Sequence, residues 1–403
     1  MSKVIVIGAG PSGLMAAYIA SRNGHSVSLF EKNAQMGKKL QLTGHGRCNV
    51  TNNCSKDEFF GHVVHNEKFL YSAFSQFSNI DMIQFLKKHG MPTIEEDRGR
   101  MFPSSNSAKE VALLFANLLR ENNVELHMEE NCKKLIIKDN VIQGIQTNKQ
   151  EYACDVVIVA TGGKSFSVTG SSGDGYIWAK ENNIKVSDVY PGLVSLKTKE
   201  QFDLAGLSFQ NVNIQIQKDK KVLYKNSGDI LFTHDGLSGP GILVMSSYVI
   251  NKNPTHIYID FMPNQSIDEV DQTLLNQMKK YPNKLLKSIL ENRYPNRFVE
   301  YMFSVLHINE NIKVHDTTKQ QRRSMSELLK KCSFEIESFG DFDQAMITVG
   351  GIKTNQINPK TMESKSIQGL KFVGEVLDLD AQTGGFNLQI AWTTGYVAAS
   401  TIG

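Results

Sequence analysis

The chain has 403 residues, of which 40% are hydrophobic and 21% are charged, and its formal net charge is +3. This length predicts two or three domains, and the composition excludes a disordered chain, a collagen and a disulfide-rich miniprotein. The small net charge predicts no broad basic surface of the kind that gathers nucleic acid.

The cysteines and the apolar runs limit where the protein works. Five cysteines occur without a Cys-x-x-Cys pair or a zinc-like His/Cys spacing, so we expect neither disulfides nor a metal site. No apolar run approaches the ~20 residues of a membrane span, and the first strand begins too early for a secretory signal. We therefore expect a cytoplasmic protein with no membrane partner; its oligomeric state is left open.

The N-terminus follows a strand–loop–helix–strand pattern. Residues 4–7 are a continuous apolar run, typical of a strand buried in a parallel sheet. Gly8-x-Gly10-x-x-Gly13 follows, then a helix that ends near residue 24, and then a second strand that closes on Glu31. In this context Gly8 permits a tight turn, Gly10 lets a pyrophosphate approach, and Gly13 lets the helix pack closely on the strand.

This unit predicts a dinucleotide site. The helix that begins at Pro11 and Ser12 presents free N–H groups to phosphates, and Glu31 can accept the ribose hydroxyl protons. The loop alone allows either NAD or FAD.

The middle of the chain changes from mixed to antiparallel patterns. Ser107 and Glu110 form a predicted capping box for a helix that runs to Arg120. Strands are expected over 124–128, in a meander over 133–138, 141–147 and 150–153, and in a buried run over 155–160. Residues 193–261 alternate polar and apolar, which predicts an antiparallel β domain, and residues 266–332 have helical spacing.

Strand and glycine patterns return at 345–351 and at 370–375. We therefore predict that the C-terminus rejoins the N-terminal sheet. The predicted domains are 1–191 with 345–403, an inserted β-rich substrate domain over 192–265, and a helical subdomain over 266–344.

Several sequence blocks resemble one family. Residues 36–52 (MGKKLQLTGHGRCNVTN) are similar to the diagnostic stretch of the aminoacetone-oxidase-like bacterial flavoproteins, a family of NAD(P)/FAD-dependent oxidoreductases. Further similar blocks lie at 100–103, 160–164, 170–175, 231–240, 362–365 and 374–389, and together they span nearly the whole chain.

The resemblance implies an α/β fold with a Rossmann-like FAD-binding domain of the glutathione-reductase type, into which the β and helical domains are inserted. It also implies FAD as the cofactor. Glycine-rich residues 43–49 suit a loop beside the pyrophosphate and flavin, and the helix after residue 385 suits the negative charge of a reduced flavin. The predicted cofactor-binding residues are Gly8, Gly10, Pro11, Ser12, Gly13, Glu31, Lys32, Lys39, Thr43, Gly46, Arg47, Cys48, Asn49, Thr161, Gly162, Gly374, Glu375, Gly384, Gly385, Phe386, Asn387 and Leu388.

Catalytic groups are less marked, because hydride transfer depends more on positioning than on a fixed triad. His234, Arg100 and Lys164 lie in family-like blocks and are the predicted catalytic residues. Each has a structural alternative: a turn for His234, ion pairs with Glu95, Glu96 or Asp97 for the arginines Arg98 and Arg100, and solvent for Lys164. His62, His65 and Tyr71 follow the FAD loop and are weaker candidates, and Cys48 is expected to be a packed residue rather than a redox thiol.

Three functions stay open. The first is an FAD-dependent oxidoreductase of a small metabolite, an amine or amino-ketone oxidised with O2. The second is an NAD(P)H-driven reductase of an activated C=C or C=O bond. No second strand-flanked G-x-G-x-x-G is visible, so NAD(P)H would bind only transiently. The third is a flavin-containing tRNA-binding or tRNA-modifying protein, which the absence of a basic stripe disfavours.

Overall fold

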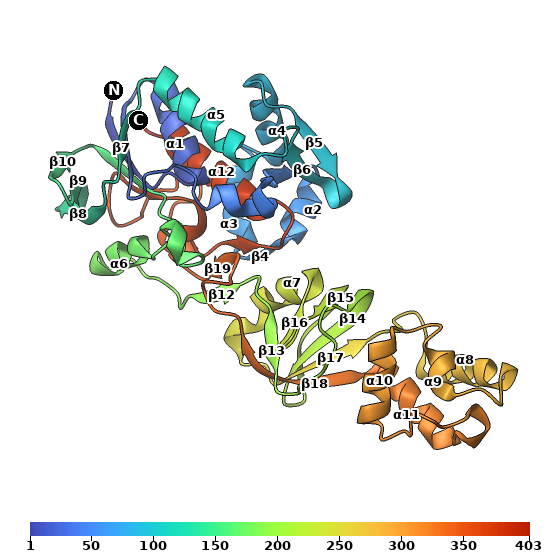
Figure 1. The fold of residues 1–403 in the computed structure, drawn as a ribbon. Helices are drawn as coiled ribbons and strands as arrows, with labels where there is room; N and C mark the ends of the chain where they lie inside the picture. Colours follow the sequence, from blue (N-terminus) through green and yellow to red (C-terminus); the bar gives the residue numbers. More distant parts are fainter. The chain divides into compact units, whose positions relative to one another are not determined.

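A computed structural model describes all residues, Met1–Gly403. The chain divides into two compact units (Figure 1). Unit 1 combines Met1–Gly192 with Phe342–Gly403, and unit 2 is Leu193–Asp341. Each unit has its own hydrophobic core.

The centre of unit 1 is a five-stranded parallel sheet. Its order is β20-β11-β1-β2-β7, and its strands are Leu370–Phe372, Val156–Val159, Lys3–Ile7, Ser26–Glu31 and Glu125–Met128. Val4 pairs with Val156 on one side and with Val27 on the other. The unbroken apolar runs are explained by this central position, where both faces of a strand are covered.

The C-terminal segment rejoins this sheet, as expected. β20 pairs with β11, and the chain then forms α12 (Phe386–Ser400), which packs against α1 (Pro11–Arg22). The two helices approach closely because Gly395 has no side chain: a Cβ there would lie 2.3 Å from the carbonyl oxygen of Ser12.

Smaller sheets surround the parallel sheet. The predicted meander is present as β8 (Cys132–Lys138), β9 (Val141–Thr147) and β10 (Glu151–Ala153). The other pairings are β3-β6-β5 (Thr51–Asn52, Arg100–Pro103, Thr93–Glu96), β21-β4 (Asp380–Ala381, Val63–His65) and β12-β19 (Tyr190–Gly192, Ile347–Val349). The remaining helices of unit 1 are α2 (Lys56–Gly61), α3 (Glu67–Phe74), α4 (Asn79–Lys88), α5 (Ala108–Glu121) and α6 (Asp174–Glu181).

One predicted cap is wrong. Helix α5 begins after Ser107 as expected, but the Ser107 side chain makes no cap hydrogen bond. Instead, the backbone N–H of Glu110 donates to the Ser107 carbonyl oxygen at 3.2 Å. The capping-box pattern is satisfied elsewhere, by Ser55 with Glu58 and by Ser78 with Asp81.

Unit 2 contains a closed barrel with strand order β13-β16-β15-β14-β17-β18. The strands are Leu196–Thr198, Gly236–Ser238, Lys221–Phe232, Ser208–Lys218, His256–Asp260 and Cys332–Phe339. Alternate residues point inward, so Ile214 and Ile216 are buried in the barrel core. Helix α7 (Pro240–Val249) interrupts the stretch for which we predicted only strands.

The helical part of unit 2 comprises α8 (Ile267–Lys280), α9 (Leu286–Leu290), α10 (Asn296–Val305) and α11 (Lys319–Lys330). The expected start at Ser266 is confirmed by a capping box with Glu269. The prediction that 266–344 is a separate helical segment is wrong at β18. Its buried Cys332, Phe334 and Ile336 alternate with period two and complete the barrel. No helix in the chain combines the length and apolar character needed to cross a bilayer.

Candidate functional site

The glycine loop closes tightly on the sheet but is open on one side. A Cβ at Gly13 would lie 1.9 Å from the Gly8 carbonyl oxygen, and a Cβ at Gly8 would lie 2.5 Å from that of Ala160. At Gly10, by contrast, no atom lies within 4 Å of a Cβ. Gly10 is the N-cap of α1, where the first N–H groups of the helix have no partner within the helix. The loop is thus shaped to hold an anion at Gly10.

Glu31 lies at the end of β2, beside this loop. Its Oε2 accepts a hydrogen bond from the backbone N–H of Ala9 at 2.9 Å. Its Oε1 accepts from the backbone and side-chain N–H groups of Asn33 at 2.8 and 2.7 Å. The carboxylate is therefore held in place at the position expected for a ribose contact.

A polar network involving Glu375 adjoins the loop on the other side. Glu375 Oε2 accepts from Lys39 Nζ at 2.9 Å, and Oε1 accepts from Ser165 Oγ at 2.8 Å and from the Thr348 backbone N–H at 2.7 Å. Burial alone would raise the pKa of Glu375, but Lys39 and these hydrogen bonds outweigh it and hold the pKa below its usual range. The network joins residues that lie far apart in the chain.

Thr161, Gly162 and Gly374 lie between the loop and this network. A Cβ at Gly8 would lie 3.3 Å from Thr161 Cα, and one at Gly162 would lie 3.9 Å from Glu375 Oε2. A Cβ at Gly374 would lie 2.5 Å from Ser12 Oγ. These residues follow β1, β11 and β20, so the predicted set converges at the carboxyl ends of parallel strands, where open α/β sheets bind ligands.

The two segments predicted to approach the flavin also lie together. Asn52 Nδ2 donates to the Gly384 carbonyl oxygen at 3.0 Å, and Thr51 Oγ1 donates to Gln389 Oε1 at 2.7 Å. Gly385, with φ +96°, is the N-cap of α12. The side-chain oxygens Oδ1 of Asn49 and Asn52 are buried without a hydrogen-bond partner. The free N–H groups at the start of α12 therefore lie close to the unpartnered Oδ1 of Asn49, which would be 2.9 Å from a Cβ at Gly385.

These observations fit FAD. The open side of Gly10 suits the pyrophosphate, Glu31 suits the adenosine ribose, and the start of α12 suits the electron-rich edge of the flavin. Phe386 is buried at that start, while Asn387 and Leu388 are half-buried. The assignment of individual cofactor contacts remains a prediction.

Arg47 and Arg100 lie in a cluster of their own. Arg47 forms an ion pair with Glu96 and donates to Asn106 Oδ1 at 2.7 and 2.9 Å. Its guanidinium carbon lies 4.3 Å from the centre of the Phe102 ring, and that of Arg100 lies 5.7 Å from it. Arg100 also lies 3.7 Å from Glu96. The predicted ion-pair alternative is thus present for Arg100, and Arg47 pairs with the same glutamate.

The rest of the 43–49 loop is partly structural. Thr43 Oγ1 donates to the Leu40 carbonyl oxygen at 2.7 Å. Cys48 is fully buried, and burial raises its thiol pKa to about 12, which agrees with a packed residue rather than a redox thiol. Gly46 is exposed, with φ +85° and no atom within 4 Å of a Cβ.

The remaining predicted residues have different surroundings. Lys32 is bound to Asp174 at 2.8 Å and to Ser172 Oγ at 2.6 Å. Lys164 is exposed, and no hydrogen bond or ion pair joins it to Arg100. His234 is exposed on the β15–β16 loop of unit 2. The three predicted catalytic residues therefore stay predictions.

A pair that we did not select lies close to the start of α12. His65 Nδ1 and Asp380 Oδ1 are 2.6 Å apart, and Asp380 is only 1% exposed. The sequence marks His65 only as a weaker candidate, and Asp380 is not among the predicted residues. The sequence signal is the spacing of Asp378 and Asp380 on either side of Leu379, in a segment between Glu375 and a glycine-rich helix start.

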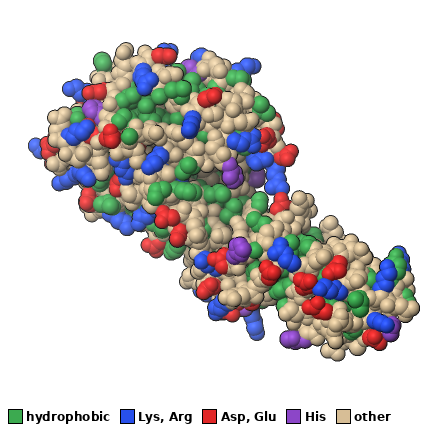
Figure 2. All heavy atoms as spheres, viewed as in Figure 1, with side chains coloured by type: hydrophobic (Ala, Val, Ile, Leu, Met, Phe, Trp, Pro, Cys, Tyr) green, Lys and Arg blue, Asp and Glu red, His purple; other side chains and the backbone are tan.

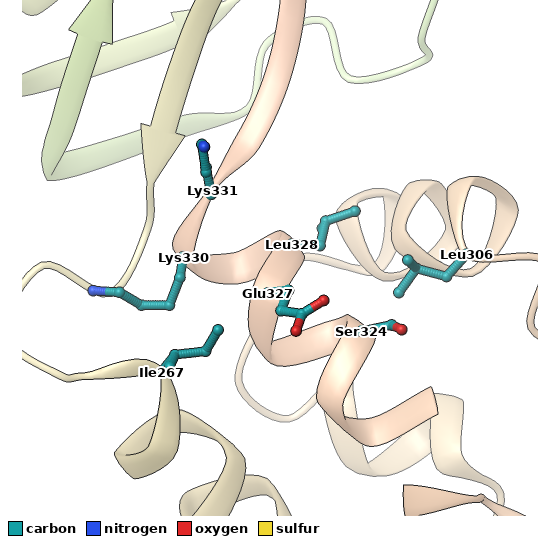
Figure 3. A pocket seen from close by; sticks show the side chains of 7 residues that line it. All are labelled: Ile267, Leu306, Ser324, Glu327, Leu328, Lys330 and Lys331. Atoms are coloured by element: carbon teal, nitrogen blue, oxygen red, sulfur yellow. The ribbon is translucent and has the colours of Figure 1, made fainter. Parts of the chain in front are cut away.

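The cleft in Figure 3 is a different feature. It measures about 430 Å³ and lies in unit 2. Its lining residues are Ile267, Leu306, Ser324, Glu327, Leu328, Lys330 and Lys331. Lys330 Nζ is bound to Asp260 at 2.7 Å and to the Met262 carbonyl oxygen at 2.8 Å, and none of the predicted site residues lines the cleft. On the face shown in Figure 2, basic and acidic side chains are interspersed.

Comparison with known proteins identifies the family. The model of the HI0933-like protein Rossmann domain matches residues 2–401. The chain belongs to the HI0933-like family. This chain is similar to a 3-dehydro-bile acid delta(4,6)-reductase of Clostridium scindens, with 29% identity over 99% of this chain and 98% of that protein. It is also similar to a ribosomal RNA dihydrouridine synthase of Haemophilus influenzae, with 30% identity over 100% of this chain and 98% of that protein.

A solved structure gives the same fold. The 3-ketosteroid delta1-dehydrogenase of Sterolibacterium denitrificans superposes with a TM-score of 0.54, at 13% identity, over 99% of this HI0933-like chain and 98% of that protein. The expected Rossmann-type FAD-binding fold is confirmed, and the chain is an FAD-dependent oxidoreductase. The two full-length relatives named above are a reductase and a synthase.

Proposed function

We propose that this HI0933-like protein reduces a C=C bond that is conjugated to a carbonyl group. The main support for the proposal is the similarity of this chain, over nearly its whole length, to two proteins. The names of both proteins imply reduction of such a C=C bond. A 3-dehydro-bile acid with delta(4,6) bonds holds C=C bonds conjugated to a ketone. Dihydrouridine is uridine saturated at the ring C=C bond that is conjugated to a carbonyl. Both conversions add a hydride at one carbon and a proton at the next.

The residues described above suit this chemistry. FAD supplies two-electron transfer when it is bound. Gly10 and the start of α1 would hold the pyrophosphate, and Glu31 would hold the ribose. The start of α12, with Gly385 as its N-cap, would stabilise negative charge on the reduced cofactor.

For the electron donor we propose NAD(P)H bound transiently at the flavin. The chain has one strand-flanked G-x-G-x-x-G, at Gly8–Gly13, and that loop is assigned to FAD. In this proposal NAD(P)H binds at the flavin, reacts and leaves before the substrate enters. This order of events predicts ping-pong kinetics.

The first test uses the protein reconstituted with FAD under anaerobic conditions. NADPH or NADH is added, and bleaching of the oxidised flavin absorbance is followed. The reduced protein is then mixed with a 3-oxo-4,6-diene steroid or with a uridine-containing ribosomal RNA fragment. Reoxidation of the flavin by either acceptor, with a product two hydrogens heavier, supports the proposal. Bleaching by aminoacetone or another amine, with peroxide formed from O2, would instead establish the amine oxidase and overturn it.

A second candidate function is that of an RNA-modifying enzyme, whose substrate would be a uracil base in RNA. Besides the Haemophilus influenzae relative, the β14–β15 hairpin of unit 2 favours it. Lys218, Lys220, Lys221 and Lys225 are all exposed there, with Asp219 as the acidic residue among them. Such a local cluster suits phosphate contacts, although the protein has no broad basic field.

RNA binding separates this candidate from a small-ketone reductase. The double variant K220E/K221E should weaken binding of a ribosomal RNA fragment and reduce the salt dependence of the affinity. Lys279 and Lys280, at the end of α8, offer a matched control, because they form another lysine pair outside the hairpin. Equal RNA affinity in the wild type and in both double variants would remove the hairpin from the interface.

A further inference from the structure

A histidine–aspartate pair ties together two short strands of unit 1. His65 ends β4 and Asp380 begins β21, and these residues are partners in the antiparallel pairing. His65 Nδ1 lies 2.6 Å from Asp380 Oδ1. The Asp380 side chain is 1% exposed, whereas that of His65 is 30% exposed. The carboxylate thus lies behind the ring, and the ring reaches the surface of the unit.

Burying the carboxyl group of this pair costs free energy of folding, which suggests that the pair has a function. Burial raises the pKa of Asp380, and only its interaction with His65 opposes this effect appreciably. Its second oxygen, Oδ2, is buried without a hydrogen-bond partner. A carboxylate on one ring nitrogen fixes the ring orientation, stabilises its protonated form and leaves the transferable proton on Nε2.

The pair is held against the start of α12. The ring of His62 stacks on that of Phe386 with 4.3 Å between centres, and His62 Nδ1 lies 2.9 Å from Gln382 Oε1. Asn387 Oδ1 accepts from the Ala381 backbone N–H at 2.9 Å, and its Nδ2 donates to the Ala381 carbonyl oxygen at 2.7 Å. The residue after Asp380 is therefore fixed to the helix start that we assign to the flavin.

We propose that His65, positioned by Asp380, donates the proton that completes reduction of the conjugated C=C bond. This proposal rests on the proposed function. The substrate β-carbon accepts a hydride from the reduced cofactor, and the π electron pair of the C=C bond moves to the α-carbon. There it forms a C–H bond with the Nε2 proton of His65. In total the substrate would gain one hydride, whose two electrons the bound FAD would supply in its reduced form, and one proton from His65. The neutral His65 then regains a proton from solvent.

Other charged and titratable groups face this pair. Asp378 is influenced by His65 and is held by Ser187 Oγ at 3.2 Å, and burial raises its pKa. Glu375 acts on Asp380 with like charge. His62 lies on the same segment as His65. Two carboxyl groups, those of Asp378 and Asp380, therefore act on His65, and Asp380 is the one in direct contact with its ring.

The test compares two acceptors that differ in their need for a proton donor. A conjugated ketone requires a proton at the α-carbon, whereas a nitroalkene yields a stable nitronate anion after hydride addition alone. His65→Gln is measured with both acceptors, using prereduced holoenzyme in an anaerobic stopped-flow instrument. His127→Gln is the matched control, because His127 Nδ1 also lies beside a buried carboxylate, 3.4 Å from Glu130.

We expect H65Q to slow the ketone by about 10²- to 10⁴-fold and to leave the nitroalkene rate nearly unchanged. H127Q should slow neither. Equal slowing of both acceptors in H65Q would show a purely structural role, and retention of both rates would also overturn the proposal. If the wild type reduces neither acceptor, the proposed function itself fails, and the role of His65 fails with it.

The positioning role of Asp380 has a readout that needs no cofactor. In FAD-free protein, the Nδ1 proton of His65 should give a downfield NMR signal typical of a short hydrogen bond to a carboxylate. This signal should vanish in H65Q and in Asp380→Asn but persist in H127Q. In reduced holoenzyme, D380N should slow the ketone more than the nitroalkene. A signal unchanged in D380N would overturn the positioning of His65 by Asp380.

Discussion

An added methyl group is expected to lower FAD affinity at Gly10 but to lower the stability of the apoprotein at Gly13. Gly10 has φ −80° and ψ 179°, an extended conformation that any residue adopts, and a Cβ there meets no atom within 4 Å. In Gly10→Ala the apoprotein loses little: the free energy of unfolding should stay within about 1 kcal/mol of the wild type. The methyl group instead occupies the space that we assign to the pyrophosphate.

The expected loss in G10A is therefore one of FAD affinity. A charge-assisted hydrogen bond to a phosphate contributes about 1.5–3 kcal/mol, and each bond lost lowers the affinity by about 10- to 150-fold. In Gly13→Ala the Cβ would lie 1.9 Å from the Gly8 carbonyl oxygen, so α1 must move away from the loop. Overpacking of this kind should destabilise the apoprotein by about 1–3 kcal/mol or more.

Both quantities are measured on FAD-free protein, by urea unfolding and by titration with FAD while flavin fluorescence is followed. Gly61→Ala is the control, since a Cβ at Gly61 also meets no atom within 4 Å but lies on α2. The reasoning is refuted if G10A binds FAD as tightly as the wild type. It is also refuted if G13A unfolds at the wild-type urea concentration.

Three further predictions follow from the polar groups and thiols. The folded-state pKa of Glu375 lies below the usual 4.5, so the wild type should be more stable than Glu375→Gln above pH 4.5 and should lose this difference as the pH falls below it. Urea unfolding of both proteins from neutral to acid pH measures the difference. A difference that stays constant with pH would contradict the prediction. Burial raises the pKa of four thiols to about 12, so a thiol reagent at pH 8 should modify at most the half-buried Cys54 in the native protein and all five cysteines in denaturant. Arg322→Met, which leaves Asp271 without its two 3.0 Å hydrogen bonds, should lower the free energy of unfolding by about 3 kcal/mol, and R322M/D271L should recover most of that loss.

Much of the FAD-binding fold was predictable because its signals are local. The apolar run at 4–7, the glycine loop and Glu31 lie within a short stretch, and each has one physical reason to be there. The same holds for the meander, whose turn residues Asp139 and Asn140 adopt the positive φ angles that such hairpins need.

Other features depend on partners that no local pattern encodes. His65 and Asp380 are separated by 315 positions, and Arg47 and Glu96 by 49. The strand predicted at 370–375 is present as Leu370–Phe372, but its Lys371 has a role that periodicity cannot reveal. The buried Nζ donates to the Ala398 carbonyl oxygen at 2.8 Å, near the end of α12. Strand β18 was missed because its short alternation follows directly on the helical pattern of α11.

The split of unit 1 along the chain has a consequence for how the holoprotein matures. Strand β20 and helix α12 are synthesised only after all of unit 2, although they flank the N-terminal loop in the finished unit. Until they arrive, one edge of β11 is unpaired and α1 lacks its neighbour. A nascent chain therefore contains the loop that we assign to the pyrophosphate long before the helix start that we assign to the flavin. We therefore expect FAD to bind only after the C-terminal segment is made, and a chain cut short after unit 2 to expose the unpaired edge of β11.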